Sequence, residues 1–149
     1  MIVDGRALAK EVLARAKTRA QKLQRRPNLL VYVAPDETPA TRSYLKIKER
    51  SAEEAGCDFE ETKSLTFSSR ADAVIVQLPL PSELNTAHIL NSIPIQQDAD
   101  VLSSAAREKF GRGDTDALLP PVVGAVHEIF IQNSVDAKGK KAVVIGDGW

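Results

Sequence analysis

The sequence predicts an α/β fold in which a mostly parallel sheet is flanked by helices. Three short apolar runs are typical of buried strands, at 29–33, 73–81 and 140–148. Segments with helical spacing of apolar residues lie between them. Strands that alternate with helices favour a parallel sheet, and such a sheet binds its ligands at the carboxyl ends of its strands.

The composition indicates a soluble globular protein. The 149 residues suffice for one domain with its own core, and 43% of them are hydrophobic. Twenty basic and twenty acidic side chains cancel, so neither nucleic acid nor a membrane is expected as a partner. The start of the chain is not typical of a signal peptide, and the single Cys57 cannot form an internal disulfide. A cytoplasmic location is therefore expected.

The first half of the chain contains two predicted helices with clear boundaries. Apolar residues at helical spacing predict a helix at 8–23, with Asp4 as its cap. A second helix is expected at 39–55, because Thr38 offers a cap and proline suits the first helical position. Gly56 is expected to end it.

Weaker patterns predict the remaining elements. A strand is expected within 58–65 and a short helix at 84–93. A polar loop through 97–100 follows, and a further helix is expected at 122–131. The GRGDTD segment at 111–116 is expected to form a surface turn.

The second predicted helix places a lysine on a face that is expected to be buried. Tyr44, Lys48, Ala52 and Ala55 share this face because they are three or four residues apart. A buried ammonium group tends to lose its proton or to find a partner, and either outcome is useful in catalysis. The alternative is that the stem of Lys48 covers apolar surface while its head reaches water.

Gln77 is an unusual residue for the predicted strand at 73–81. Inside a strand that is buried on both faces, its amide must satisfy one acceptor and two donors. Pro79 and Pro81 end regular pairing directly afterwards. Gln77 is therefore expected near the carboxyl end of a central strand, where it faces a ligand or bonds to a neighbouring loop.

Asp98 and Asp100 follow the predicted short helix and are expected to face the same crevice. Two carboxylates without an accompanying histidine or cysteine are too few for a metal, so no metal site is predicted. Turn formation is the default interpretation of both aspartates.

The chain closes with a glycine turn after an apolar run. Gly146 and Gly148 frame this turn, which is the place where dinucleotide phosphates meet a helix N-terminus. Because the sequence stops at Trp149, before any following helix, we expect it to be a fragment of a longer protein.

Five segments occur in an order that is more specific than any of them alone. They are the DGRALA start, the helix with a tyrosine and a lysine four residues apart, VQLPLP at 76–81, QQDADV at 96–101 and GKKAVVIGDG at 139–148. VQLPLP is the most specific of the five. Together they resemble the bifunctional methylenetetrahydrofolate dehydrogenase / methenyltetrahydrofolate cyclohydrolase family of one-carbon metabolism.

The resemblance implies a folate-binding catalytic domain at 1–118. A connecting helix, followed by the first strand and glycine turn of a truncated Rossmann-like NAD(P) domain, would occupy 119–149. The implied reactions are the oxidation of methylenetetrahydrofolate and the hydrolysis of its methenyl product to formyltetrahydrofolate. Tetrahydrofolate derivatives as substrates and a homodimer are implied as well.

The resemblance also implies roles for individual residues. Lys48 would be the catalytic lysine with Gln77 as its partner, and Tyr44 would stack on or orient the substrate. Asp100 would bind the pterin ring through paired hydrogen bonds. The implied substrate-binding set is Tyr44, Lys48, Gln77, Leu78, Pro79 and Asp100.

Gly146, Asp147 and Gly148 would approach the dinucleotide in the same comparison. NADP is the implied cofactor. Asp147 stands where an arginine is frequent, and its charge would repel a 2′-phosphate, which leaves NAD as the alternative.

The chain departs from the family pattern at several positions. Residues 65–72 are too few for a helix that is usual there, and LPPVVG at 119–124 replaces a Pro-Cys-Thr-Pro segment. Val101 replaces a glycine, and Thr41 replaces a serine. Two alternatives therefore stay open: a non-catalytic homologue that binds folate or serves in interactions, and an unrelated α/β dehydrogenase.

Overall fold

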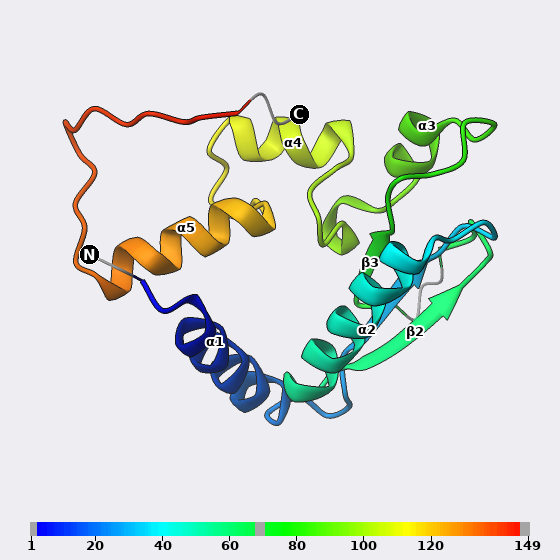
Figure 1. Cartoon of the computed structure of the whole chain (residues 1–149), viewed down its shortest axis with the longest axis horizontal. Helices are drawn as coiled ribbons and strands as arrows, with labels where there is room; N and C mark the ends of the chain where they lie inside the picture. The colour runs from blue at the N-terminus through cyan, green and yellow to red at the C-terminus, as the bar shows by residue number, and fades with distance from the viewer. Residues whose placement is uncertain (1–2, 68–70, 147–149) are drawn as a thin grey trace.

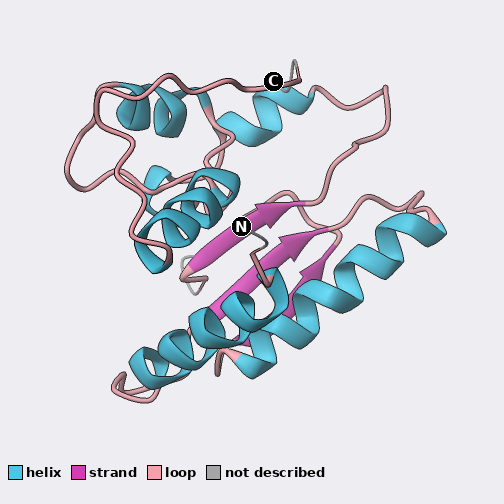
Figure 2. Cartoon of the chain, turned by 60° about the vertical axis from the view of Figure 1, so that its left-hand side comes forward, coloured by secondary structure: helices cyan, strands magenta, loops and turns pink. Residues whose placement is uncertain are grey.

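The computed structural model describes residues 3–67 and 71–146, and within these residues three parallel strands form one sheet (Figure 2). The central strand β1 (Asn28–Tyr32) pairs with β2 (Asp58–Thr62) on one side and with β3 (Ala73–Val76) on the other. Burial follows this order: the end of β1 is buried, whereas the edge strand β2 is mostly exposed and accordingly polar.

Side chains from alternate residues of the sheet build two apolar clusters. Leu30 and Tyr32 point to one face, whereas Val31 and Val33 point to the other, because successive strand residues face opposite sides. Helix α3 (Thr86–Asn91) contributes to the first cluster and α2 (Pro39–Glu54) to the second. The sheet is therefore covered by a helix on each face.

The remaining helices extend the chain beyond the sheet (Figure 1). They are α1 (Gly5–Ala20), the 3-10 turn η1 (Ile95–Gln97), α4 (Ser104–Gly111) and α5 (Pro121–Gln132). Helices α1 and α5 are joined by an ion pair of 2.6 Å between Arg15 and Glu128. No described helix is long and apolar enough to cross a membrane.

Capping explains where α1 and α2 begin, as the sequence predicts. The Asp4 carboxylate accepts hydrogen bonds from the backbone N–H groups of Arg6 and Ala7. Thr38 Oγ1 accepts from the N–H of Thr41, and proline occupies the first turn of α2. Gly56 follows α2 with φ of +78°, the left-handed conformation that favours glycine at a helix end.

The buried face of α2 differs from the prediction. Leu45 is 0% exposed and packs under the helix, whereas Tyr44 is 63% exposed. Ala52 and Ala55 are buried as expected. The predicted stripe is wrong at its N-terminal end, because Leu45 and not Tyr44 packs against Val31, Val33 and Ile75 of the sheet.

The buried strand predicted at 140–148 is wrong for the part that the structure describes. Residues 140–146 form no strand, and Val143, Val144 and Ile145 are 76%, 89% and 96% exposed. An apolar run becomes a buried strand only where a neighbouring strand pairs with its backbone. The described residues place no such partner beside this segment, so its sequence pattern is not realised.

Two further differences concern chain segments near the site. The predicted strand at 73–81 ends at Val76, and β3 lies at the edge of the described sheet, not at its centre. Helix α4 was not expected from the sequence; it begins after Ser103, whose Oγ accepts from the N–H of Ala106. The surface turn predicted at 111–116 is confirmed for the residues after α4.

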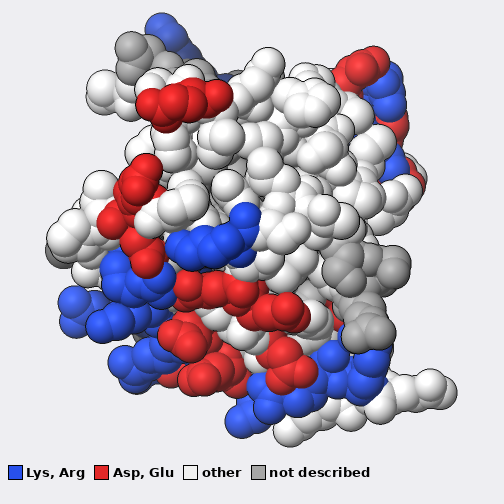
Figure 3. All heavy atoms as spheres, turned by 90° about the vertical axis from the view of Figure 1, so that its right-hand side faces the viewer, with Lys and Arg blue, Asp and Glu red and all other residues white. Residues whose placement is uncertain are grey.

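Charged side chains of both signs lie next to one another on the face in Figure 3. Such mixing produces no strong field of one sign on that face.

Truncation of Leu45 tests the packing of α2 on the sheet. Leu45→Ala is expected to lower the free energy of unfolding by about 2–5 kcal/mol, because it removes a fully buried side chain and leaves a cavity. The measurement is urea denaturation followed by circular dichroism. Ile47→Ala is the matched control on the same helix, since Ile47 is 62% exposed and should cost less than about 1 kcal/mol. Equal losses in both variants would contradict this packing.

Candidate active site

Lys48 of α2 and Gln77 at the end of β3 form the centre of the candidate site. The Nζ of Lys48 donates a hydrogen bond of 3.1 Å to Oε1 of Gln77. The Nε2 of Gln77 donates in turn to the carbonyl of Leu78 at 2.8 Å. Both polar ends of the amide thus have a partner, and the amide holds the ammonium group at a defined place.

The backbone around Gln77 is held by the sheet beyond the last residue of β3. The N–H of Gln77 donates to the carbonyl of Tyr32 at 2.9 Å, which continues the ladder with β1 by one residue. Pro79 and Pro81 then prevent further pairing, and the Leu78–Pro79 peptide bond is cis. Gln77 therefore lies at the carboxyl edge of the sheet, as predicted.

Asp100 is the third charged or polar group of the site. It lies in the turn after η1, and this turn runs along β3 because the N–H of Ala99 donates to the carbonyl of Val74 at 3.2 Å. Burial raises the pKa of the Asp100 carboxyl, the positive charge of Lys48 lowers it, and the charge of Asp98 raises it further. The structure therefore brings the predicted Asp100 into the electrostatic reach of Lys48.

Asp98 does not share the crevice with Asp100, which corrects the sequence-based expectation. Its side chain is 1% exposed and accepts hydrogen bonds from the N–H groups of Leu102 at 3.2 Å and Ser103 at 2.8 Å. The two carboxylates are one residue apart, yet one stabilises the turn and the other lies in the site.

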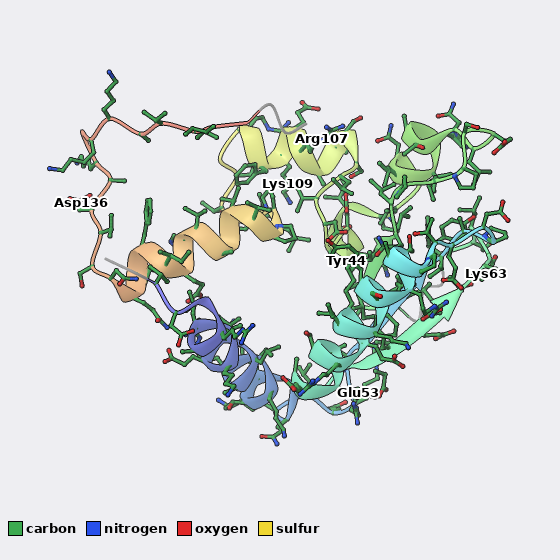
Figure 4. The ribbon with its side chains drawn as sticks, in the orientation of Figure 1. Tyr44, Glu53, Lys63, Arg107, Lys109 and Asp136 are labelled. Carbon is green, nitrogen blue, oxygen red and sulfur yellow. The ribbon has the colours of Figure 1, made fainter. Side chains whose placement is uncertain are left out.

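Tyr44 lies one helical turn before Lys48 and is largely exposed, so its ring is free to contact a ligand. Figure 4 shows it on the side of α2 that faces α4 and α5. Leu78 and Pro79 follow Gln77 directly, and Pro79 lines a cavity beside it. The six predicted substrate-binding residues thus come from three chain segments that meet at one edge of the sheet.

Two cavities each have one residue of the Lys48–Gln77 pair on their walls. One of about 230 Å³ is lined by Gln77 and by Thr38 and Thr41 at the start of α2. The other, of about 400 Å³, is mostly apolar and lies between α2, including Lys48, and the amino ends of β1 and β3. A larger cavity of about 600 Å³ lies between α1 and α5 and has none of the predicted site residues on its walls.

Sequence reasoning gave no site role to the polar residues of the smaller cavity. Glu37 lines it and pairs with Arg42, which also pairs with Glu61 of β2 at 2.6 Å. These pairs tie the loop before α2 to the edge strand. The pair of Glu37 and Arg42 joins residues that are close in the sequence, so the sequence offered a weak signal for it. The pair of Arg42 and Glu61 joins distant segments and is visible only in the tertiary structure.

The backbone conformation of Val101 explains why a glycine is expected at this position. Its φ is +54°, a left-handed conformation that a β-branched residue rarely adopts, and its side chain is 2% exposed. Glycine is the residue that adopts this conformation without strain, so the turn itself accounts for the expectation of glycine at this position.

The predicted cofactor residues are not assembled into a site by the described residues. Gly146 lies in the exposed segment 140–146, which runs along the outside of the molecule in Figure 1. Asp147 and Gly148 lie outside the described residues. Among the described residues, no group of three or more metal-ligating side chains is present.

Comparison with known proteins identifies the relatives of the chain. No protein-family model matches it. The Bifunctional protein FolD of Hydrogenobaculum sp. is 28% identical over 164 residues, which cover 99% of this chain and 59% of the relative. The FolD methylenetetrahydrofolate dehydrogenase/cyclohydrolase of Campylobacter jejuni superimposes with a TM-score of 0.89 and 26% identity, over 97% of this chain and 57% of the other. The chain is similar to the FolD proteins over nearly its whole length.

This similarity to FolD confirms the predicted resemblance and the α/β fold. A FolD structure from Trypanosoma brucei, at 21% identity and a TM-score of 0.77, supports the fold as well. The chain spans 59% of the length of its Hydrogenobaculum relative and 55% of the Syntrophobacter fumaroxidans FolD. The roles of individual residues remain predictions.

Replacing Asp100 by asparagine tests the electrostatics of the site. Because burial raises the pKa of Asp100, its ionised form destabilises the folded chain once the pH rises through that raised value. Asp100→Asn is therefore expected to raise Tm at about pH 7. The gain should disappear below about pH 3, where the wild-type aspartic acid is as neutral as the asparagine of the variant. Differential scanning calorimetry across this range measures it.

Asp116→Asn is the control for this experiment. The hydrogen bond from Lys109 lowers the pKa of Asp116, so removal of this charge should bring no gain in Tm at neutral pH. A Tm of Asp100→Asn that equals the wild-type value at every pH would show that Asp100 is not buried as described.

Proposed function

We propose that the chain binds a reduced folate at the site of Lys48, Gln77 and Asp100 and hydrolyses methenyltetrahydrofolate there. The observation that carries this proposal is the 3.1 Å hydrogen bond between Lys48 and Gln77 at the carboxyl edge of the sheet. Its support comes from relatives described as bifunctional FolD proteins and from the Campylobacter jejuni dehydrogenase/cyclohydrolase. For the whole protein we propose oxidation of methylenetetrahydrofolate as well.

Lys48 would handle the proton of the hydrolysis. Water attacks the carbon of the cationic methenyl group, and a carbon–nitrogen bond of the ring then opens to leave a formyl group. A neutral Lys48 would not repel the cation, and its Nζ would accept the proton that the attacking water releases. Gln77 supports this role because its Oε1 engages one hydrogen of Nζ and leaves the lone pair free for the proton.

Asp100 and Tyr44 would bind the folate. The carboxylate of Asp100 would accept paired hydrogen bonds from the N–H groups of the pterin ring. The exposed ring of Tyr44 would stack on the substrate, with Leu78 and Pro79 as the wall beside Gln77.

NADP, with NAD as the alternative, would supply the acceptor for the hydride in the oxidation. Relatives of both kinds exist: the Trypanosoma brucei structure is a complex with NADP, and the Saccharomyces cerevisiae enzyme is NAD-dependent. The described part of 140–146 is exposed and unpaired, which does not fit a preformed dinucleotide site. We therefore assign no step of the hydride transfer to this chain. A cytoplasmic homodimer is proposed from the resemblance alone.

The proposal is tested by measuring the turnover of methenyltetrahydrofolate, which is detected as a loss of its absorbance. Lys48→Ala is expected to lower kcat at least about 100-fold while binding of 5-formyltetrahydrofolate stays within about tenfold of wild type. Asp100→Ala should instead weaken this binding. Lys46→Ala is the matched control, since Lys46 is an exposed lysine on the same helix, and it should leave both values unchanged.

The alternatives predict different outcomes in the same experiment. A non-catalytic homologue would bind 5-formyltetrahydrofolate saturably without turnover. An unrelated α/β dehydrogenase would not bind it at all. The 149-residue chain is not expected to show robust dehydrogenase activity with NADP; such activity would contradict our assignment of the hydride step.

A further inference from the structure

Asp98 is an almost fully buried carboxylate whose hydrogen-bond partners are backbone groups. It is 1% exposed, with Oδ1 accepting from the N–H of Leu102 and Oδ2 from the N–H of Ser103. Burial of a carboxylate is costly unless such bonds compensate for the lost water. A buried acidic side chain therefore stabilises the turn between η1 and α4.

Capping of α4 does not account for this charge. The cap of α4 is the hydroxyl of Ser103, which accepts from the N–H of Ala106 at 3.2 Å. The Asp98 carboxylate binds N–H groups that precede the helix. Its bonds thus close the turn at 98–103 and leave the first turn of α4 to Ser103.

The same turn is fixed at its other end and is strained in its middle. The N–H of Ala99 donates to Val74 in β3, and the N–H of Val101 donates to the carbonyl of Asp98, each at 3.2 Å. Val101 nevertheless has φ of +54°. A β-branched residue persists in this conformation only where surrounding contacts determine it.

Asp100 lies inside this closed turn, between the fixed Ala99 and the strained Val101. The charged groups that influence its carboxyl are Lys48 from α2 and Asp98 from its own segment. The backbone of Asp100 is therefore held on both sides by the bonds of the turn.

We infer that Asp98 is a positioning residue, whose buried carboxylate closes the turn at 98–103 and thereby holds Asp100 beside Lys48. The significance for substrate binding rests on the proposed function. The closure of the turn by Asp98 is independent of it.

A double-mutant cycle on the ligand-free protein tests the inference. The pKa of Asp100 is measured by carboxyl carbon NMR in wild type, Lys48→Gln, Asp98→Asn and the double variant. Lys48→Gln should raise this pKa in the wild-type background, because it removes a positive charge. In the Asp98→Asn background the rise should fall to less than half, since Asp100 is no longer held beside Lys48. The direct effect of the Asp98 charge cancels in this difference.

Ser103→Ala is the matched control, because it tests whether a general loss of stability near the turn produces the same effect. It removes the cap of α4 but leaves the Asp98 carboxylate in place, so the full effect of Lys48→Gln should persist. The inference is overturned if the effect of Lys48→Gln is the same in the Asp98→Asn and wild-type backgrounds. Should Asp98→Asn fail to fold, Asp98→Glu, with its carboxylate displaced by one methylene, takes its place with the same expectation.

A kinetic measurement connects the turn to the proposed function. Asp98→Asn should raise KM for methenyltetrahydrofolate at least about fivefold and leave kcat within about twofold, because Asp100 contributes binding. An unchanged KM would contradict the link between the turn and binding. Absence of any folate binding by the wild-type protein would refute the proposed function, while the NMR cycle would still decide the role of Asp98.

Discussion

The parallel pairing of β3 with β1 is the interaction on which the candidate site depends. It extends one residue past β3, where the N–H of Gln77 bonds to Tyr32. On its other side, β3 holds the turn at 98–103 through Val74. Because both neighbours of Lys48 are attached to one short strand, their separation is set by a hydrogen-bonded ladder and does not depend on flexible loops.

Helix α2 supplies the other half of the site, and its placement follows from apolar packing. Leu45 is fully buried against the face formed by Val31, Val33 and Ile75. This contact turns Lys48 toward Gln77 and leaves Tyr44 exposed. A buried leucine thus orients the polar residues on either side of it in the sequence, because a helix that packs on one face presents the adjacent positions at its flanks.

The candidate site combines an acidic, a basic and a neutral polar side chain. Asp100 is destabilised as an anion by burial and by Asp98, whereas Lys48 favours the anion. Gln77 is neutral and contributes an acceptor to Lys48 without adding charge. The second carboxylate, Asp98, is bonded to backbone N–H groups of the turn.

The sequence by itself determined the elements with strong local signals and the residues of the candidate site. Caps at Asp4 and Thr38, the glycine stop at Gly56 and the prolines after Gln77 are local features, since their physics involves only neighbouring residues. Lys48, Gln77 and Asp100 stood out as polar residues in an apolar or turn pattern, but their predicted roles came from the resemblance to the family. Tertiary structure alone decided the rest: that Leu45 and not Tyr44 is buried, that Asp98 is structural while Asp100 lies in the site, and that the apolar run at 140–146 stays unpaired. These outcomes depend on the angle of a helix on a sheet, on bonds between distant segments and on the presence of a partner strand, none of which is encoded in local spacing.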